Sequence, residues 1–319
     1  MSTRSPGLRG VLSPVLTPFN ADGSPSIPRF VNHCHWLLRR GVGLAIFGTN
    51  SEANSLSVSE KRALLDTLLE AGVPPARLLP GGGACALPDV IELTSHAVKS
   101  GCAGVLMLPP FFYKGVSDEG LFRVFADVIE TIADSRLRLY LYHIPAVTQV
   151  GVSFALIERL LARYPGVVAG IKDSSGEWDH TAALLKEFQS DDFDVFAGTE
   201  TLLLPTLQNG GAGCITATGN VNPSAIVRLA DSWCDADAAA RQRVLNDTRA
   251  IFQRYPIIPA MKATIAAQTG DSQWGAVRAP LVELDSVQQH ELQRALTENG
   301  FAMDDARSLA LSHGEPRTV

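Results

Sequence analysis

Short apolar runs and segments of helical period alternate through the first two-thirds of the chain, and this alternation restricts the fold more than any other feature. Each apolar run ends in Gly, Pro, Thr or Ser before a helix-period segment begins. Such alternation is typical of repeated βα units with parallel strands. The predicted strands are Val11–Thr17, Leu44–Gly48, Arg77–Gly81, Gly104–Leu108, Leu137–His143, Val167–Lys172, Asp194–Ala197 and Gly213–Thr216. Eight parallel strands are the number that closes a barrel.

A doubly wound open sheet would show the same alternation, so the positions of the polar residues must separate the two folds. In a barrel, reactive groups gather at the carboxyl ends of many strands. Here the polar segments GTNSE, PPFFYK, YHIP, IKDSS, AGTE and ITATGN each follow an apolar strand. A dinucleotide-binding sheet would instead carry GxGxxG after its first strand. The run Gly81–Gly83 follows the third predicted strand and does not have that spacing. The sequence therefore favours an α/β fold of the (β/α)₈ TIM barrel type.

Strand signals stop after Thr218, and the rest of the chain is predicted to be helical. The main predicted helices there are Ala236–Tyr255, Ile258–Gln268 and Val287–Glu298. We therefore expect a barrel catalytic domain over residues 8–222 and a C-terminal helical region over residues 223–312. Residues 1–7 and 313–319 are expected to be disordered tails.

Composition and charge exclude several classes of protein. The chain has 27 Lys and Arg against 33 Asp and Glu, with a net charge of -6 and no basic stripe interleaved with aromatics. A nucleic-acid partner is therefore not expected. No apolar stretch reaches the roughly 18 residues of a membrane span, and the N-terminus has no signal-type apolar region. The five cysteines form no CxxC pair, which favours a cytoplasmic protein with reduced thiols and no metal site.

Lys172 ends the apolar run in VVAGIKDSSG, where a lysine is costly because its neighbours would be buried in the sheet. Desolvation favours the neutral amine, which is the nucleophile that forms an imine with a ketone. A structural alternative stays open, in which Lys172 extends out of the strand end and pairs with Asp173 or another acid. Position alone favours neither interpretation.

Tyr142 and the pair Thr49 and Asn50 also follow predicted strands. Tyr142 ends the strand before Lys172, so we expect the two side chains on adjacent strands at the same end of the barrel. A phenol there can pass a proton to or from a substrate oxygen, although filling the barrel interior is the more ordinary role for such a ring. The hydroxyl, amide and backbone N–H groups of Thr49 and Asn50 can hold a carboxylate, although Gly-Thr-Asn-Ser is also a common turn.

Together these segments resemble a known enzyme family. GTNSE (48–52), PPFFYK (109–114), YHIP (142–145), GIKDSS (170–175), FAGTE (196–200) and GAGCITAT (211–218) are similar, in order and spacing, to the dihydrodipicolinate synthase and N-acetylneuraminate lyase family of class I aldolases. The resemblance covers roughly residues 8–300. It implies an eightfold barrel with a helical C-terminal region, usually a homotetramer. It also implies activation of pyruvate or another 2-oxo acid as a Schiff base, without a metal or organic cofactor.

The resemblance further implies roles for single residues. Lys172 matches the Schiff-base lysine of the family. Tyr142 matches the tyrosine that shuttles protons and touches the pyruvate carboxylate. The positions that match pyruvate-binding residues are Thr49, Asn50, Gly198 and Ile215.

Three departures from the family pattern bear on the substrate. Val147 stands where dihydrodipicolinate synthases carry the arginine that holds the carboxylate of aspartate semialdehyde, so that bidentate clamp is missing. Lyase-like members of the family carry an apolar residue at this position. Val147 therefore favours an N-acetylneuraminate lyase-like or 2-keto-3-deoxy-sugar-acid aldolase-like enzyme. Asn50 replaces the usual threonine. In family members that use a Thr-Tyr-Tyr triad as a proton relay, this change would remove one hydroxyl. The tyrosine that crosses from the neighbouring subunit aligns with Phe112, and a one-residue insertion would let Tyr113 replace it.

Two alternatives of different kinds remain open. One is a true 4-hydroxy-tetrahydrodipicolinate (dihydrodipicolinate) synthase, with hydratase-aldolases and dehydratases as further enzymatic options. The other is a protein that binds a 2-oxo acid in the barrel mouth without turnover, which the absent arginine makes conceivable. The presence of both Lys172 and Tyr142 argues against the second alternative.

Overall fold

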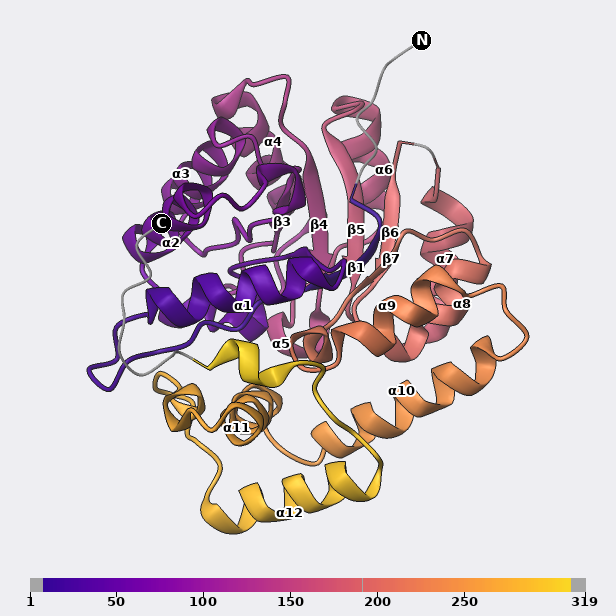
Figure 1. Ribbon diagram of the computed structural model, residues 1–319. Coiled ribbons are helices and arrows are strands. Elements are labelled where there is room, and N and C mark those ends of the chain that lie inside the picture. Colours follow the sequence, from indigo (N-terminus) through magenta and orange to yellow (C-terminus); the bar gives the residue numbers. More distant parts are fainter. Residues whose placement is uncertain (1–7, 191, 311–319) are drawn as a thin grey trace.

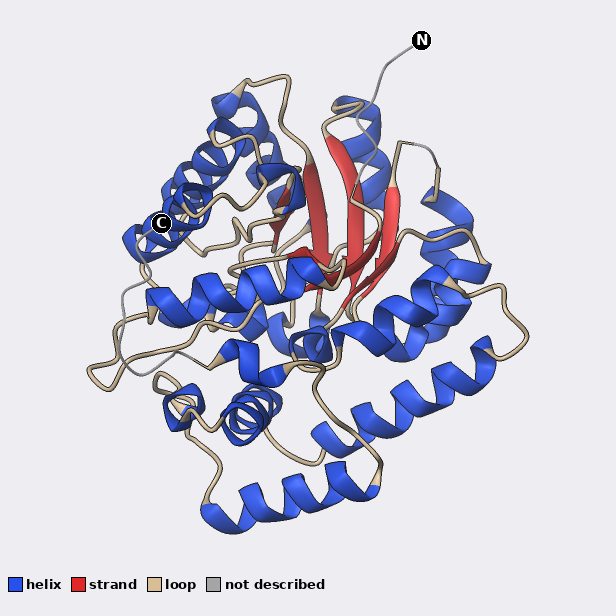
Figure 2. Cartoon of the chain, viewed as in Figure 1, coloured by secondary structure: helices blue, strands red, loops and turns tan. Residues whose placement is uncertain are grey.

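The computed structural model describes residues 8–190 and 192–310. Its centre is a curled parallel sheet with the strand order β2-β1-β7-β6-β5-β4-β3, enclosed by helices (Figures 1 and 2). The strands are β1 (Gly10–Ser13), β2 (Gly43–Leu44), β3 (Val105–Met107), β4 (Leu139–His143), β5 (Val168–Asp173), β6 (Asp194–Ala197) and β7 (Gly213–Ile215). All pairings between them are parallel, so their carboxyl ends meet at one end of the sheet.

The third predicted strand, Arg77–Gly81, is not a regular strand, and that prediction was wrong in detail. Arg77 ends a 3₁₀ turn, after which residues 78–82 run between the two edges of the sheet. Backbone hydrogen bonds and isolated parallel bridges join this segment to β2 on one side and to β3 on the other. Pro80 has no N–H to donate, which leaves the bonding on one side incomplete. The segment still closes the barrel, so the predicted TIM barrel is confirmed.

The triple-glycine run at the end of this segment allows a close approach of neighbouring chains. A Cβ on Gly81 would stand 2.2 Å from Phe47 O, and one on Gly83 would stand 2.7 Å from Leu108 Cβ. Neither position has room for a side chain. Close packing at the barrel closure therefore accounts for these glycines without a phosphate-binding role.

The helices that follow the barrel strands lie on the outside of the sheet (Figure 1). They are α1 (Ile27–Arg39), α2 (Val58–Glu70), α3 (Leu87–Lys99), α4 (Asp118–Ile132), α6 (Phe154–Arg163), α7 (Trp178–Phe188), α8 (Leu203–Gln208) and α9 (Pro223–Asp231). The short helix α5 (Pro145–Thr148) lies instead at the carboxyl end of β4. In α6, for example, the Ser153 side chain accepts a hydrogen bond from Leu156 N, and Leu156, Ile157 and Leu160 are buried. A capped start and an apolar face toward the sheet are what a packed surface helix needs.

Beyond α9 the chain is helical, as expected, and its long helices are α10 (Ala238–Phe252), α11 (Ile257–Thr269) and α12 (Ser286–Glu298). α10 packs against α9 and against the 3₁₀ turn Glu200–Leu202 that follows β6, which places it beside the carboxyl ends of the strands. The boundary between a barrel domain and a helical region at residue 222 stays a prediction. The predicted tails, residues 1–7 and 313–319, lie outside the described residues.

Two apolar clusters form the core of the protein. The smaller one fills the barrel interior and includes Leu12, Phe196 and Ile215. The larger one lies between the sheet and the helices and continues into the C-terminal helices. In the part of the chain that the structure describes, no helix is both long and apolar enough to cross a membrane.

Candidate active site

A cavity of about 350 Å³ opens at the carboxyl ends of the barrel strands. Its walls are formed by the segments that follow β2, β4, β5, β6 and β7, together with parts of α10 and α11. This is the end of a TIM barrel at which reactive side chains from different strands meet. Most of the residues singled out from the sequence line this cavity.

Lys172 and Tyr142 lie side by side in the wall of the cavity. They are register partners on β5 and β4, and Lys172 Nζ donates a hydrogen bond to Tyr142 Oη at 3.2 Å. Both are buried, with 2% and 3% of their surface exposed. Asp173 does not pair with Lys172, because its carboxylate instead accepts hydrogen bonds from Thr181 and Ser175. The structural alternative of a strand-end lysine paired with Asp173 is therefore wrong.

The phenol of Tyr142 is held among polar groups that favour its ionised form. Thr49 Oγ1 lies 3.4 Å from Tyr142 Oη. Burial by itself raises the pKa of Tyr142, but the charge of Lys172 and hydrogen bonds from Thr49, Lys172 and Ser174 bring the pKa below its ordinary value. A phenol that releases its proton more readily than free tyrosine is suited to carrying a proton near neutral pH.

Gly198 lines the cavity at a position where only a glycine fits. Its N–H donates to Asp173 O at 2.6 Å, and a Cβ on Gly198 would stand 2.0 Å from Ser174 Oγ. Ile215 differs: it is fully buried in the barrel-interior cluster and is absent from the described lining of the cavity.

The rim of the cavity is open and partly apolar. Val147 on α5 lines it with 60% of its surface exposed. Tyr113 and Phe112 are 72% exposed and pack edge to face at 5.4 Å, and neither contributes to the cavity walls within the described residues of this single chain. Of the residues expected at the site, the structure brings together Lys172, Tyr142, Thr49, Asn50, Gly198 and Val147.

Several polar groups of the cavity were missed by the sequence analysis. Ser174 and Thr201 stand within or beside the motifs IKDSS and FAGTE, and could have been included on that ground. Arg249 and Gln253 come from the end of α10, which the sequence predicts only as a helix. No local pattern could have assigned those two residues to the barrel mouth.

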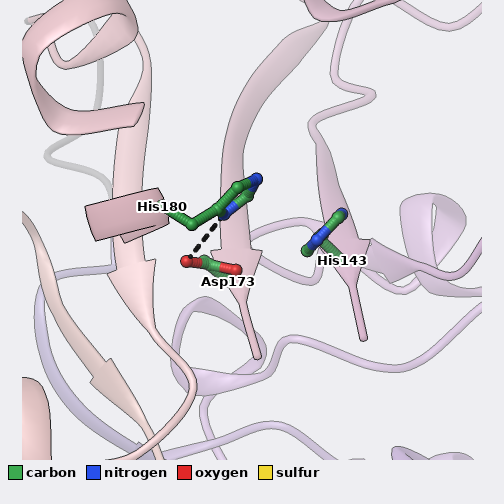
Figure 3. Close-up of side chains that lie close together, drawn as sticks. All are labelled: His143, Asp173 and His180. Carbon is green, nitrogen blue, oxygen red and sulfur yellow. Dashed lines mark ion pairs between the residues drawn. The ribbon is translucent and has the colours of Figure 1, made fainter. Parts of the chain in front are cut away.

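Behind the cavity, on the outer side of β4 and β5, His143, Asp173 and His180 lie together (Figure 3). His180 Nδ1 is 3.1 Å from Asp173 Oδ2, and the two histidine rings stack at 4.6 Å. Val152 N donates to His143 Nδ1 at 3.0 Å, so in the neutral ring this nitrogen is unprotonated and Nε2 carries the proton. A protonated Nε2 has no lone pair for a metal ion. The geometry therefore fits a packed polar group around Asp173, whose carboxylate is held by Ser175 and Thr181, better than a metal centre.

Comparisons with known proteins identify the family of this chain. A model of the dihydrodipicolinate synthetase family matches residues 7–299. An uncharacterised DapA-like lyase from Chloroflexus aurantiacus is 32% identical over 291 residues, covering 90% of this chain and 95% of that protein. The crystal structure of dihydrodipicolinate synthase from Agrobacterium tumefaciens has a TM-score of 0.84 and 32% identity, covering 91% of this chain and 98% of that chain. A prophage protein of the dihydrodipicolinic acid synthase family from E. coli K12, solved in complex with pyruvate, has a TM-score of 0.83 and 28% identity, covering 92% and 99%.

Proposed function

This chain belongs to the dihydrodipicolinate synthetase family, and we propose that it makes or breaks a carbon–carbon bond next to pyruvate with Lys172 as the Schiff-base nucleophile. Membership of the family makes the chain an enzyme of the class I lyase and aldolase type. One observation carries the choice of Lys172: it is a buried lysine at a barrel strand end that contacts a phenol and has no carboxylate partner among the described residues. Such a lysine is placed for nucleophilic catalysis.

The proposed cleavage reaction begins with attack of the Lys172 amine on the ketone carbon of a 2-oxo acid. Loss of water gives a protonated imine, which is an electron sink for the neighbouring bond. Tyr142 takes the proton from the hydroxyl on the carbon beyond that bond, the bond breaks, and its electron pair forms the enamine. The aldehyde leaves, the enamine carbon takes up a proton, and water releases pyruvate from the lysine. Synthesis is the same sequence in reverse.

Thr49 and Asn50 are proposed to hold the carboxylate of the bound 2-oxo acid. They begin the 3₁₀ turn Thr49–Ser51, and both line the cavity that contains Lys172. The first N–H groups of such a turn have no partner within it, and they favour an anion together with a neighbouring hydroxyl or amide. Gly198 supports this pocket by allowing the segment after β6 to pack closely against Ser174 after β5.

Val147 supports a lyase or aldolase of sugar-derived 2-oxo acids over a dihydrodipicolinate synthase. Its exposed side chain offers no positive charge to the carboxylate of aspartate semialdehyde. Losing one charge-assisted contact costs about 1.5 to 3 kcal/mol, or roughly ten- to over a hundredfold in rate. Aspartate semialdehyde should therefore be a poor partner in a coupled condensation assay. Condensation as efficient as any aldol cleavage would restore the synthase alternative.

Borohydride trapping tests the central proposal. Reduction in the presence of pyruvate should leave a covalent adduct on Lys172, located by peptide mass spectrometry. Lys262 and Lys114 serve as internal controls, since Lys262 is paired with Glu52 and Lys114 Nζ donates to Thr148 O at 2.7 Å. No adduct, or an adduct on those two lysines alone, contradicts the proposal. An adduct without turnover of any 2-oxo acid would favour the non-catalytic binding protein.

We propose further that the enzyme is a cytoplasmic homotetramer. The exposed aromatic pair Phe112 and Tyr113 supports burial in a subunit contact, where Tyr113 could enter a neighbouring active site. All five cysteines are free, which supports a reducing compartment. Analytical ultracentrifugation tests the assembly, and replacement of Tyr113 by Ala should lower turnover if its hydroxyl is used in trans.

A further inference from the structure

Arg249 reaches the active-site cavity from α10, outside the strand-and-loop repeat of the barrel. It lines the same cavity as Lys172, and 12% of its side chain is exposed. Its Nη1 donates to Glu200 Oε2 at 3.2 Å. Its Nε is buried and makes no hydrogen bond within the described part of the chain. An arginine has five N–H donors, so most of this guanidinium's donor capacity is unused.

Glu200 compensates the charge of Arg249. It follows β6, is 2% exposed, and accepts hydrogen bonds from the hydroxyls of Thr216 and Thr218 as well as from Arg249. Three donors converging on one buried side chain are what a carboxylate requires. Gln242, also on α10, donates to Glu200 O at 2.9 Å and fixes the helix against this turn. The guanidinium is thus held at the cavity in a neutral pair.

The remaining charge in the cavity belongs to Lys172. No acidic side chain lines this cavity within residues 8–190 and 192–310, and its basic side chains are Lys172 and Arg249. When Lys172 becomes a protonated imine, the carboxylate of the 2-oxo acid balances it. A second anion on the substrate would therefore meet no uncompensated cation, and desolvating it there would be costly.

We propose that Arg249 is a specificity-determining residue that donates hydrogen bonds to the oxygens of the aldehyde-derived end of the substrate. We infer that this end is a neutral, hydroxylated carbon chain, without a second carboxylate or phosphate. A hydroxyl oxygen accepts from the spare guanidinium donors, and the same hydroxyl can donate a hydrogen bond to the neighbouring hydroxyl of Thr199 or Thr201. This inference rests on the proposed function and names the substrate class of the same site.

The experiment compares two substrates with one carbon skeleton: 2-keto-3-deoxygluconate, whose aldehyde end is neutral, and its 6-phosphate. Wild-type kcat/KM should be higher for the neutral compound. Arg249→Met keeps the stem and removes the donors, so kcat/KM for the neutral compound should fall roughly tenfold to a hundredfold. Because the proposal places Arg249 at the aldehyde-derived end of the substrate and not at pyruvate, the rate of borohydride trapping with pyruvate should be unchanged. Arg243→Met, an exposed change on the same helix, is the matched control and should behave as wild type.

Two further variants guard against misfolding, because Arg249→Met leaves Glu200 buried without its cation. Glu200→Gln with Arg249→Met removes both charges and should show the same loss with an intact melting transition. Glu200→Gln alone frees the charge of Arg249, so the preference for the neutral compound over its phosphate should shrink about tenfold or more. A wild-type preference for the phosphate, or undiminished cleavage by the folded double variant, overturns this inference. Absence of the pyruvate adduct in wild type would instead overturn the proposed function.

Discussion

Two of the buried lysines of this protein sit in opposite surroundings. Lys172 ends β5 at the barrel mouth, where its ammonium group lies 4.3 Å from the centre of the Tyr142 ring and donates to that residue's hydroxyl. Lys262 lies on α11, is fully buried, forms an ion pair with Glu52 and donates to Ala276 O at 2.7 Å. Lys172 lines a cavity of about 350 Å³, whereas Lys262 on α11 is buried against Glu52 and the ring of Phe19.

The difference shows that two buried lysines can differ in whether a carboxylate compensates their charge. A buried ammonium needs compensation, and Lys262 receives it from a carboxylate and a carbonyl. Glu52 is held in the left-handed backbone region, with φ 56°, and also accepts a hydrogen bond from Arg278 N, so it is fixed in place as a structural partner. Among the described residues, the hydrogen-bond partner of Lys172 is the hydroxyl of Tyr142 and not a carboxylate. A covalent bond to a ketone can therefore form without breaking an ion pair.

The largest expected effect comes from removing each lysine in turn. Lys172→Met should reduce 2-oxo acid cleavage by about 10⁴-fold or more, because the covalent route is lost. Lys262→Met should leave kcat per folded molecule within a few-fold of wild type, since Lys262 does not line the cavity. Steady-state kinetics, corrected for the folded fraction by circular dichroism, measure both. Equal losses of kcat in the two variants would contradict the proposed difference between Lys172 and Lys262.

Tyr142→Phe should have the next largest effect. It keeps the ring and removes only the hydroxyl, so the fold should survive with a change of about 0.5 to 1.5 kcal/mol in the free energy of unfolding. Loss of a proton carrier lowers the rate by about 10² to 10⁴. Because Lys172 is still present, borohydride should still trap pyruvate on it. Cleavage at a near wild-type rate would return Tyr142 to a barrel-filling role and direct attention to Tyr113 or a bound water.

The sequence could predict which side chains lie close together where those side chains stand at strand ends. Lys172 and Tyr142 were assigned to adjacent strands because each ends an apolar run, and parallel strands bring such ends together. The third predicted strand is not regular because Pro80 has no N–H to donate. Its segment nevertheless closes the barrel. Ile215 was placed at the pocket by resemblance; it lies in the barrel-interior cluster together with Tyr142, but the described lining of the cavity does not include it.

Residues that reach the site from another layer could not be predicted in this way. Arg249 is assigned to the cavity by the packing of α10 against the turn after β6, a contact between segments far apart in sequence. The pairing of Lys262 with Glu52 is equally long-range. Periodicity reports which face of a helix is buried, but it does not name the partner.

Lys262→Met should show its effect in stability. Removing one member of a buried ion pair leaves the other charge uncompensated and costs about 3 to 5 kcal/mol. The free energy of unfolding from urea titration should fall by that amount. Adding Glu52→Gln to Lys262→Met removes the stranded carboxylate and should recover most of the loss. A double variant no more stable than the single one would mean that Glu52 is satisfied mainly by other partners.

The dependence of stability on pH gives the smallest and most specific test of the pair. Burial lowers the pKa of Lys262 to about 8, although the nearby Glu52 carboxylate acts in the opposite direction. In the unfolded chain a lysine titrates near its ordinary value of about 10.4. Below about pH 8 both states hold the proton, and the native state bears the full cost of burying it. Between about pH 8 and about pH 10.4 the unfolded state binds more protons than the native state, so the free energy of unfolding rises with pH.

The separation of these two pKa values corresponds to a rise of about 3 kcal/mol in the free energy of unfolding across that window. Other lysines and tyrosines titrate there as well, so the quantity to measure is the difference between wild type and the variant with both Glu52→Gln and Lys262→Met. Urea titrations at about pH 7.5 and about pH 10 should show wild type gaining stability relative to that variant. A difference that stays flat or declines would mean that Glu52 outweighs burial and keeps Lys262 charged throughout. Lys262 would then be stabilised by its partner at every pH in the window, and its contrast with Lys172 would be greater than the pKa of about 8 implies.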